Sequence, residues 1–130
     1  FLQTLAAGRS LPEILDHAGT LDDPVIHAEA LRCEVDGLAF ALTAERYADE
    51  AKAGKGIGDA SAMLKYMGTE INKRRLELMM SALGTEATDW DGDDGVAADW
   101  LRTKANSIEG GTSEVMLDII AKRVLELPSK

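Results

Sequence analysis

The stretch best suited to chemistry is SIEGGTSEV, residues 107–115, where two adjacent glycines precede hydroxyl and carboxylate side chains. Gly110 and Gly111 permit backbone conformations, and a close approach to a ligand, that other residues do not. They lead into an apolar helical pattern, and the first N–H groups of a helix lack intrahelical acceptors. Such a helix start attracts anions, and residues 112–114 add two hydroxyls and a carboxylate able to accept a ribose hydrogen bond. Two interpretations stay open, a capped helix start and a nucleotide site, and caps are the commoner.

Glu109, directly before the two glycines, raises a separate question. A carboxylate can act as a general base when its surroundings bring its pKa close to the working pH. The plainer alternative is a side chain that faces water, as most glutamates do. The residues alone leave both roles open for Glu109.

No metal site is predicted. The acidic loop DWDGDDG, residues 89–95, suggests calcium, because hard cations prefer clustered carboxylates. An EF-hand counted from Asp89 needs Gly at its sixth position and Glu at its twelfth, but these positions hold Asp94 and Trp100. A solvated turn is therefore the better interpretation of this loop.

Two further patterns have structural explanations. The basic run NKRR, residues 72–75, is typical of a solvated helix face paired with Glu70 and Glu77. Methionines at helical spacing can line an adaptable apolar pocket, although the same spacing predicts core positions. The methionines concerned are Met63, Met67, Met79 and Met80.

Composition limits the classes of function. The 130 residues form one predicted domain, and 45% apolar residues with only 5% aromatic ones favour packed helices. A net charge of -9 argues against nucleic-acid binding. The single Cys33 excludes an internal disulfide, and no apolar run is long enough to span a membrane. We expect a cytoplasmic protein without membrane insertion, and the start at Phe1 suggests a piece of a longer chain.

Helical periodicity and capping signals predict the elements that position these residues. Short helices are expected at residues 1–8 and 10–19, and longer ones at residues 24–53 and 59–83. The predicted helix starts are a capping box of Ser10 and Glu13, a cap at Asp22 or Asp23 before Pro24, and a cap at Asp59. A short helix over residues 96–106 should bury Val96, Trp100 and Leu101. A last helix should start at Thr112 or Ser113, stop before Pro128, and bury Val115, Ile119, Ile120 and Val124. The predicted fold is all-α, an antiparallel up-and-down helical bundle.

The helix predicted over residues 24–53 carries the clearest amphipathic pattern. Leu31, Val35, Leu38 and Leu42 repeat at spacings of three and four residues. This spacing predicts that the helix is buried over a broad stripe.

The string SIEGGTSEVMLDIIAKRVLELP resembles the C-terminal signature of the acyl-CoA dehydrogenase family. The segments DPVIHAEAL, ASAMLKYMGTEINKRRLELMMSALG and WLRTKANSI are similar to the family in order and spacing. The resemblance therefore covers nearly the whole chain. It implies the C-terminal helical-bundle domain of a protein that also has an N-terminal helical domain and a middle β domain.

The resemblance also implies an activity. Family members bind FAD between subunits and oxidise an acyl-CoA thioester to the 2-enoyl-CoA. A glutamate removes the α-proton, and the β-hydrogen leaves as hydride to the flavin. Electrons then pass to an electron-transferring flavoprotein. Homo- or hetero-tetramers are expected.

Carried over by position, Thr112 and Glu114 match the family's Thr and Gln or Glu that touch FAD near its pyrophosphate and ribose. The predicted cofactor-binding residues are Gly110, Gly111, Thr112, Ser113 and Glu114. The catalytic glutamate of a Tyr-Glu-Gly-Thr motif falls on Gly110, while Glu109 occupies the Tyr position. Glu109 is therefore a weak candidate for the base, and a base on the helix preceding Phe1, as in branched- and long-chain members, is favoured.

Two departures from the family pattern point to an unusual assembly. The Arg-x-x-Phe-Gly segment, which reaches a neighbouring subunit's flavin, falls near residues 17–20 and is absent. The Gln-x-Leu-Gly-Gly-x-Gly contact survives only as SALGTEA, residues 81–87. The chain is thus similar to subunits of heteromeric acyl-CoA dehydrogenases of lipid and steroid side-chain breakdown. A non-catalytic subunit and a helical interaction module without cofactor are the alternatives.

Overall fold

The computed structural model describes residues 10–90 and 95–128, and these residues form helices connected by turns without any β-strand. The α-helices are α1 (Leu11–His17), α2 (Pro24–Lys52), α3 (Ala60–Leu83), α4 (Val96–Asn106) and α5 (Ser113–Ile119). A 3₁₀ turn, η2 (Gly84–Thr88), follows α3, and a π-helical turn, η3 (Ile120–Val124), extends α5. The predicted all-α fold is confirmed.

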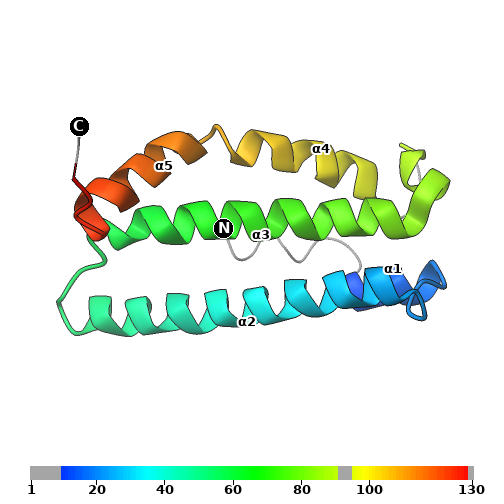
Figure 1. Ribbon diagram of the computed structural model, residues 1–130, viewed down its shortest axis with the longest axis horizontal. Helices are drawn as coiled ribbons and strands as arrows, with labels where there is room; N and C mark the ends of the chain where they lie inside the picture. The colour runs from blue at the N-terminus through cyan, green and yellow to red at the C-terminus, as the bar shows by residue number, and fades with distance from the viewer. Residues whose placement is uncertain (1–9, 91–94, 129–130) are drawn as a thin grey trace.

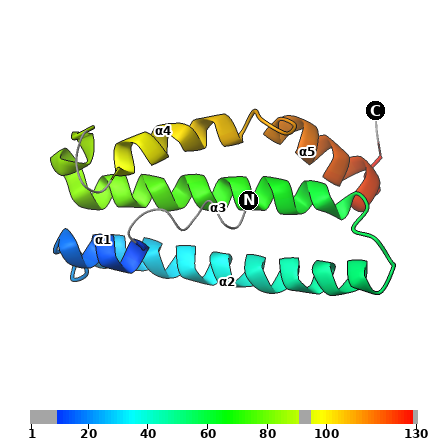
Figure 2. The same ribbon diagram turned by 180° about the vertical axis from the view of Figure 1, so that it is seen from behind.

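Helix α3 lies in the middle of the molecule (Figure 1). Helix α2 runs antiparallel along one side of α3, and α4 and α5 follow one another along the other side, as the reverse view also shows (Figure 2). Helix α1 packs at the end of the bundle where α3 finishes. Helix α3 therefore contacts every other helix, and the chain passes up and down the bundle.

Local capping signals set several helix boundaries. Ser10 and Glu13 form the predicted capping box, in which the Ser10 N–H and hydroxyl both donate to Glu13. Asp23 accepts hydrogen bonds from two backbone N–H groups in the first turn of α2, immediately before Pro24. Gly84 ends α3 with a left-handed φ of 58°.

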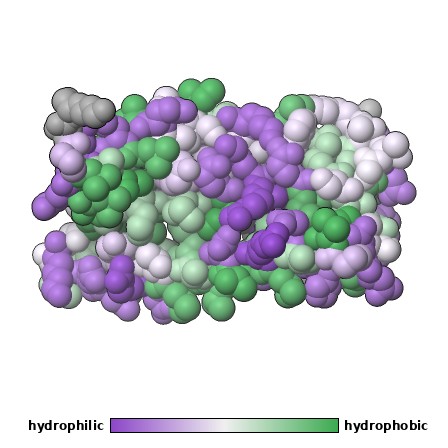
Figure 3. Space-filling view, viewed as in Figure 1, coloured by the Kyte–Doolittle hydropathy of each residue, from purple (hydrophilic) through white to green (hydrophobic). Residues whose placement is uncertain are grey.

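The prediction that α2 is buried over a broad stripe is wrong for this chain. Leu31, Val35, Leu38 and Leu42 are 55%, 66%, 62% and 58% exposed, and Cys33 is the buried residue of α2. The reason is that α2 packs chiefly on α3, and one neighbouring helix covers one narrow face. Hydrophobic side chains accordingly lie along the α2 edge of the molecule in Figure 3.

The last two predicted helices are also less buried than expected. Val96 is buried and Trp100 half-buried, but Leu101 is exposed. On the final helix, Ile119 and Ile120 are half-buried, whereas Val115 and Val124 are exposed. Helices α4 and α5 each pack on α3, so their outer faces stay open.

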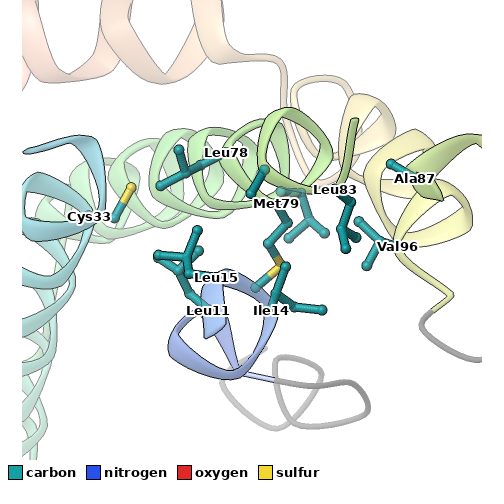
Figure 4. Packing of buried hydrophobic residues seen from close by; sticks show 11 residues of the cluster. Leu11, Ile14, Leu15, Cys33, Leu78, Met79, Leu83, Ala87 and Val96 are labelled. Atoms are coloured by element: carbon teal, nitrogen blue, oxygen red, sulfur yellow. The ribbon is translucent and has the colours of Figure 1, made fainter. Parts of the chain in front are cut away.

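The buried core lies at one end of the bundle (Figure 4). Leu11, Ile14 and Leu15 of α1 point toward α3 and meet Met79 and Leu83 there. Ile14 is fully buried. Of the four methionines, Met79 is buried, Met63 and Met80 are half-buried, and Met67 is exposed, so they do not line one pocket.

Other expectations have mixed outcomes. In the basic run, Lys73 pairs with Glu70 as predicted, but Arg74 reaches across to Asp36 on α2.

The helical piece expected at residues 1–8 and most of the acidic loop, residues 91–94, lie outside the described residues. Within the described part of the chain, no helix is both long and apolar enough to cross a membrane.

Candidate functional site

The glycine pair forms the turn that connects α4 to α5. Helix α4 ends at Asn106 and α5 begins at Ser113, with Gly110 at φ 65° and Gly111 at φ 104°. Side chains rarely adopt either conformation. A Cβ at Gly111 would also lie 2.5 Å from Cε of Met116, whereas one at Gly110 would meet open space. The turn thus depends on glycine, most strictly at position 111.

The first turn of α5 satisfies its own amides. Thr112 is the N-cap: its Oγ1 accepts from the Val115 N–H at 3.2 Å. The Ser113 N–H donates to the carbonyl of Ser107 at 2.9 Å. The Glu114 carboxylate accepts from its own backbone N–H and from the Thr112 hydroxyl, and these bonds lower its pKa. The first helical amides of α5 are therefore occupied within the chain.

The amides that remain available belong to the turn itself. The N–H groups of Gly110, Gly111 and Thr112 have no acceptor among the residues that the structure describes. Close by in sequence, the hydroxyls of Ser107 and Ser113 are buried and find no hydrogen-bond partner among these residues. Such groups suit a ligand rich in acceptor oxygens, because buried donors without acceptors are costly.

Glu109 lies in the same connection, directly before the glycine pair, and its carboxylate pairs with Arg102 of α4. Arg102 Nη2 donates to Oε1 and Oε2 of Glu109 at 3.0 and 2.9 Å, and Asn106 Nδ2 donates to Oε1 at 2.7 Å. These hydrogen bonds, that from Arg102 foremost, lower the pKa of Glu109. A lowered pKa makes the carboxylate a weaker base.

A group of polar side chains on α3 supports the junction from beneath. Lys65 Nζ donates to the carbonyls of Asn106 at 2.7 Å and Gly111 at 2.8 Å. Thr69 Oγ1 also donates to the Asn106 carbonyl, at 3.4 Å, and Asn72 Nδ2 donates to the Asn106 side-chain oxygen at 3.2 Å. Asn106 is buried and accepts hydrogen bonds from all three of these α3 side chains, while Lys65 alone among them also reaches the Gly111 carbonyl.

Sequence reasoning missed Lys65, Asn72 and Asn106. The signals were present: a lysine inside the apolar segment AMLKYM, and an asparagine at the end of a helix four residues before a glycine pair. Their partners lie 34 to 46 residues away, so no local spacing brings them together. Asn72 lies in the run NKRR, whose sequence predicts only a solvated basic face.

The two segments that depart from the family pattern lie next to each other. His17 at the end of α1 approaches Glu86 in η2, with 3.7 Å between Nε2 and Oε2. Both belong to the end of the bundle where α1 packs, whereas the Gly110–Gly111 turn lies between α4 and α5 beside the first half of α3, over Lys65 (Figure 1). The structure therefore does not bring these segments to the turn.

Comparison with known proteins identifies the family. The family described as "Acyl-CoA dehydrogenase, C-terminal domain" matches residues 7–125. Acyl-CoA dehydrogenase FadE34 of Mycobacterium tuberculosis is 29% identical over 126 residues, which cover 95% of this chain and 17% of that protein. The chain thus spans about a sixth of that relative's length. No solved structure gives a significant match. With nearly its whole length matched, the chain belongs to the acyl-CoA dehydrogenase family, in the part that forms the C-terminal domain.

Proposed function

We propose that this chain is the C-terminal domain of a FAD-dependent acyl-CoA dehydrogenase and that it forms one wall of the flavin site in the longer protein. The observation that carries the proposal is the Gly110–Thr112 turn, with three amides directed to no acceptor in the described chain. Family membership supports the same assignment. As an isolated domain the chain should not catalyse the reaction.

The residues of the turn fit the negatively charged middle of a dinucleotide. The amides of Gly110, Gly111 and Thr112 would donate to pyrophosphate oxygens, and the buried hydroxyls of Ser107 and Ser113 would gain acceptors. The Glu114 carboxylate, exposed and ionised, would accept from a ribose hydroxyl. When bound, the flavin accepts the β-hydrogen of the acyl chain as hydride.

Oxidation of an acyl-CoA to its 2-enoyl-CoA also requires a base for the α-proton. Glu109 fits this role poorly, because Arg102 and Asn106 stabilise its ionised form and lower its pKa. Both of its oxygens already accept hydrogen bonds from Arg102. We therefore assign Glu109 to the support of the junction and place the base outside this chain, with an electron-transferring flavoprotein as the final electron acceptor.

The exposed stripe of α2 supports a role in assembly. Leu31, Val35, Leu38 and Leu42 form one continuous helix face of aliphatic side chains. Contiguous apolar surface of this kind marks an interface in soluble proteins. We propose that the stripe packs against another subunit or domain in a homo- or hetero-tetramer, located in the cytoplasm.

A non-catalytic subunit of a heteromeric dehydrogenase is the second candidate. The observation that favours it is the absence of the family's cross-subunit flavin motifs from the two segments that meet at His17 and Glu86. A partner subunit would supply those contacts. A helical interaction module without cofactor is the third candidate, and the exposed α2 stripe is compatible with it.

Purification of the full-length protein tests these candidates. The first predicts a yellow protein that reduces a dye when an acyl-CoA is added; a colourless protein without turnover argues against it. Counting FAD per chain, alone and after coexpression with a candidate partner subunit, tests the second. One FAD in every chain of a homotetramer would exclude the heteromeric arrangement.

A further inference from the structure

Lys65 is the one side chain of α3 that contacts main-chain oxygens on both sides of the glycine turn, among the hydrogen bonds of the described residues. Its ammonium group donates to the last residue of α4, Asn106, and to Gly111, just before the cap of α5. Both bonds are 2.7 to 2.8 Å long, as expected for a charged donor. Lys65 is also half-buried, so water competes less for these bonds.

The bond to Gly111 has a directional consequence. In a trans peptide the C=O and the following N–H lie in one plane and point in opposite directions. The Gly111 carbonyl points toward Lys65 on α3. The N–H of Thr112, which shares that peptide unit, must therefore point away from α3, and it has no acceptor in the described chain.

We propose that Lys65 is a positioning residue, which fixes the Gly111–Thr112 peptide so that its N–H faces outward from the bundle. The inference rests on the proposed function only for the identity of the ligand, because the peptide orientation follows from the contacts within this chain. Without the ammonium group, Gly110 and Gly111 would let the peptide rotate, since glycine offers little resistance to φ changes.

The surrounding groups explain why Lys65 itself is needed. Thr69 reaches the Asn106 carbonyl only at 3.4 Å, and Asn72 contacts the Asn106 side chain. Neither contacts Gly111. Arg102 and Asn106 hold Glu109, which precedes the turn, but these bonds are made by side chains of α4 itself. Lys65 thus ties the Gly111 peptide to α3.

The experiment uses the full-length protein with Lys65→Met, which keeps an unbranched apolar side chain and removes the donors. Amide hydrogen exchange without added flavin should be at least about ten-fold faster at Ser113, whose N–H bonds Ser107 across the turn. FAD affinity should fall by about ten-fold, because a Gly111–Thr112 peptide that is no longer fixed must be ordered when the flavin binds. The melting temperature should fall by only a few degrees, as the loss of the Lys65 hydrogen bonds entails.

Lys122→Met is the matched control, because Lys122 is exposed and pairs with Asp118, one helical turn earlier, and not with the glycine turn. Lys65→Arg, which keeps a charge and several donors, should restore FAD affinity to within about three-fold of wild type. If Lys65→Met does not fold, Lys65→Gln replaces it, with the same increases expected.

Exchange at Ser113 equal in the Lys65 and Lys122 variants would overturn the positioning role, whatever happens to FAD. An affinity loss that Lys65→Arg does not recover would also count against it. A wild-type protein that binds no FAD would instead contradict the proposed function, and the exchange measurement would still decide the role of Lys65.

Discussion

Arg102 and Glu109 form a forked contact in which one guanidinium nitrogen donates to both carboxylate oxygens, at 3.0 and 2.9 Å. The two residues lie seven positions apart, one on α4 and one in the turn that follows it. The contact therefore joins the turn to the helix that precedes it, and it favours the ionised form of Glu109.

Glu109→Gln should reduce stability at neutral pH and have little effect in acid. The pKa of Glu109 in the folded protein lies below its usual value of 4.5. Its ionised form therefore stabilises the fold above about pH 4.5, and that contribution is lost as the pH falls through the lower folded value. Urea unfolding at about pH 7 and about pH 3 measures the difference. Glu34→Gln, at an exposed site on α2, is the control.

The same variant tests the assignment of the base. If Glu109 only supports the junction, Glu109→Gln in the full-length enzyme should retain dye reduction within about ten-fold of wild type, far less than the loss of a catalytic base entails. The acid limb of the pH–rate profile should be unchanged. A loss of a thousand-fold or so, with that limb abolished, would make Glu109 the base after all.

Gly111→Ala should destabilise the protein by about 2 kcal/mol and Gly110→Ala by about 1 kcal/mol, because both residues have positive φ but only Gly111 lies against Met116. The Met116 side chain is flexible and can move, which limits the additional destabilisation at Gly111 to about 1 kcal/mol. Gly37→Ala, inside α2 with open space around it, should instead be stabilising by up to about 1 kcal/mol. Equal effects at all three sites in urea unfolding would contradict the role of the turn.

Charge placed on the α2 stripe should separate the subunits. Val35→Glu with Leu38→Glu puts two carboxylates among exposed aliphatic side chains, so the full-length protein should sediment as a smaller species. Ala51→Glu, at an exposed position outside the stripe, should leave the assembly intact. Unchanged sedimentation of the double variant would show that another surface holds the subunits together.

The core at the α1 end should respond strongly to truncation. Ile14 is fully buried, so Ile14→Ala should cost about 2 to 5 kcal/mol of unfolding free energy. Val25 is 70% exposed, and Val25→Ala should cost less than about 0.5 kcal/mol. Urea titration of both variants checks the contrast, and a small effect at Ile14 would mean that α1 does not dock as the structure shows.

Local signals predicted most helix boundaries, because capping depends on residues close in sequence. Ser10 with Glu13 and Asp23 with Pro24 each marked a helix start. The predicted cap Asp59 differs, since its side chain makes no cap bond and contacts Arg123 instead. A carboxylate at a helix start can accept either from a nearby amide or from a cation far away in sequence. Local sequence does not show whether the fold brings such a cation close.

Burial was harder to predict than helicity. The periodicity of Leu31 to Leu42 was visible, but periodicity only says that one face is apolar and leaves open what covers it. The candidate site shows the same contrast between local and long-range features. The glycine turn is predicted from its own residues, whereas the role of Lys65 becomes visible only because α3 packs beneath the turn. The assignment of residues 110–114 to FAD stays a prediction.

The central place of α3 constrains how this domain can change. A substitution on α3 must suit neighbours on two sides at once, since α2 packs on one flank and α4 and α5 on the other. The outward side of α2 packs on no part of the core, so substitutions there are constrained only by the surface that covers it. Related chains can therefore change their assembly through α2 while the packing beneath the glycine turn is kept.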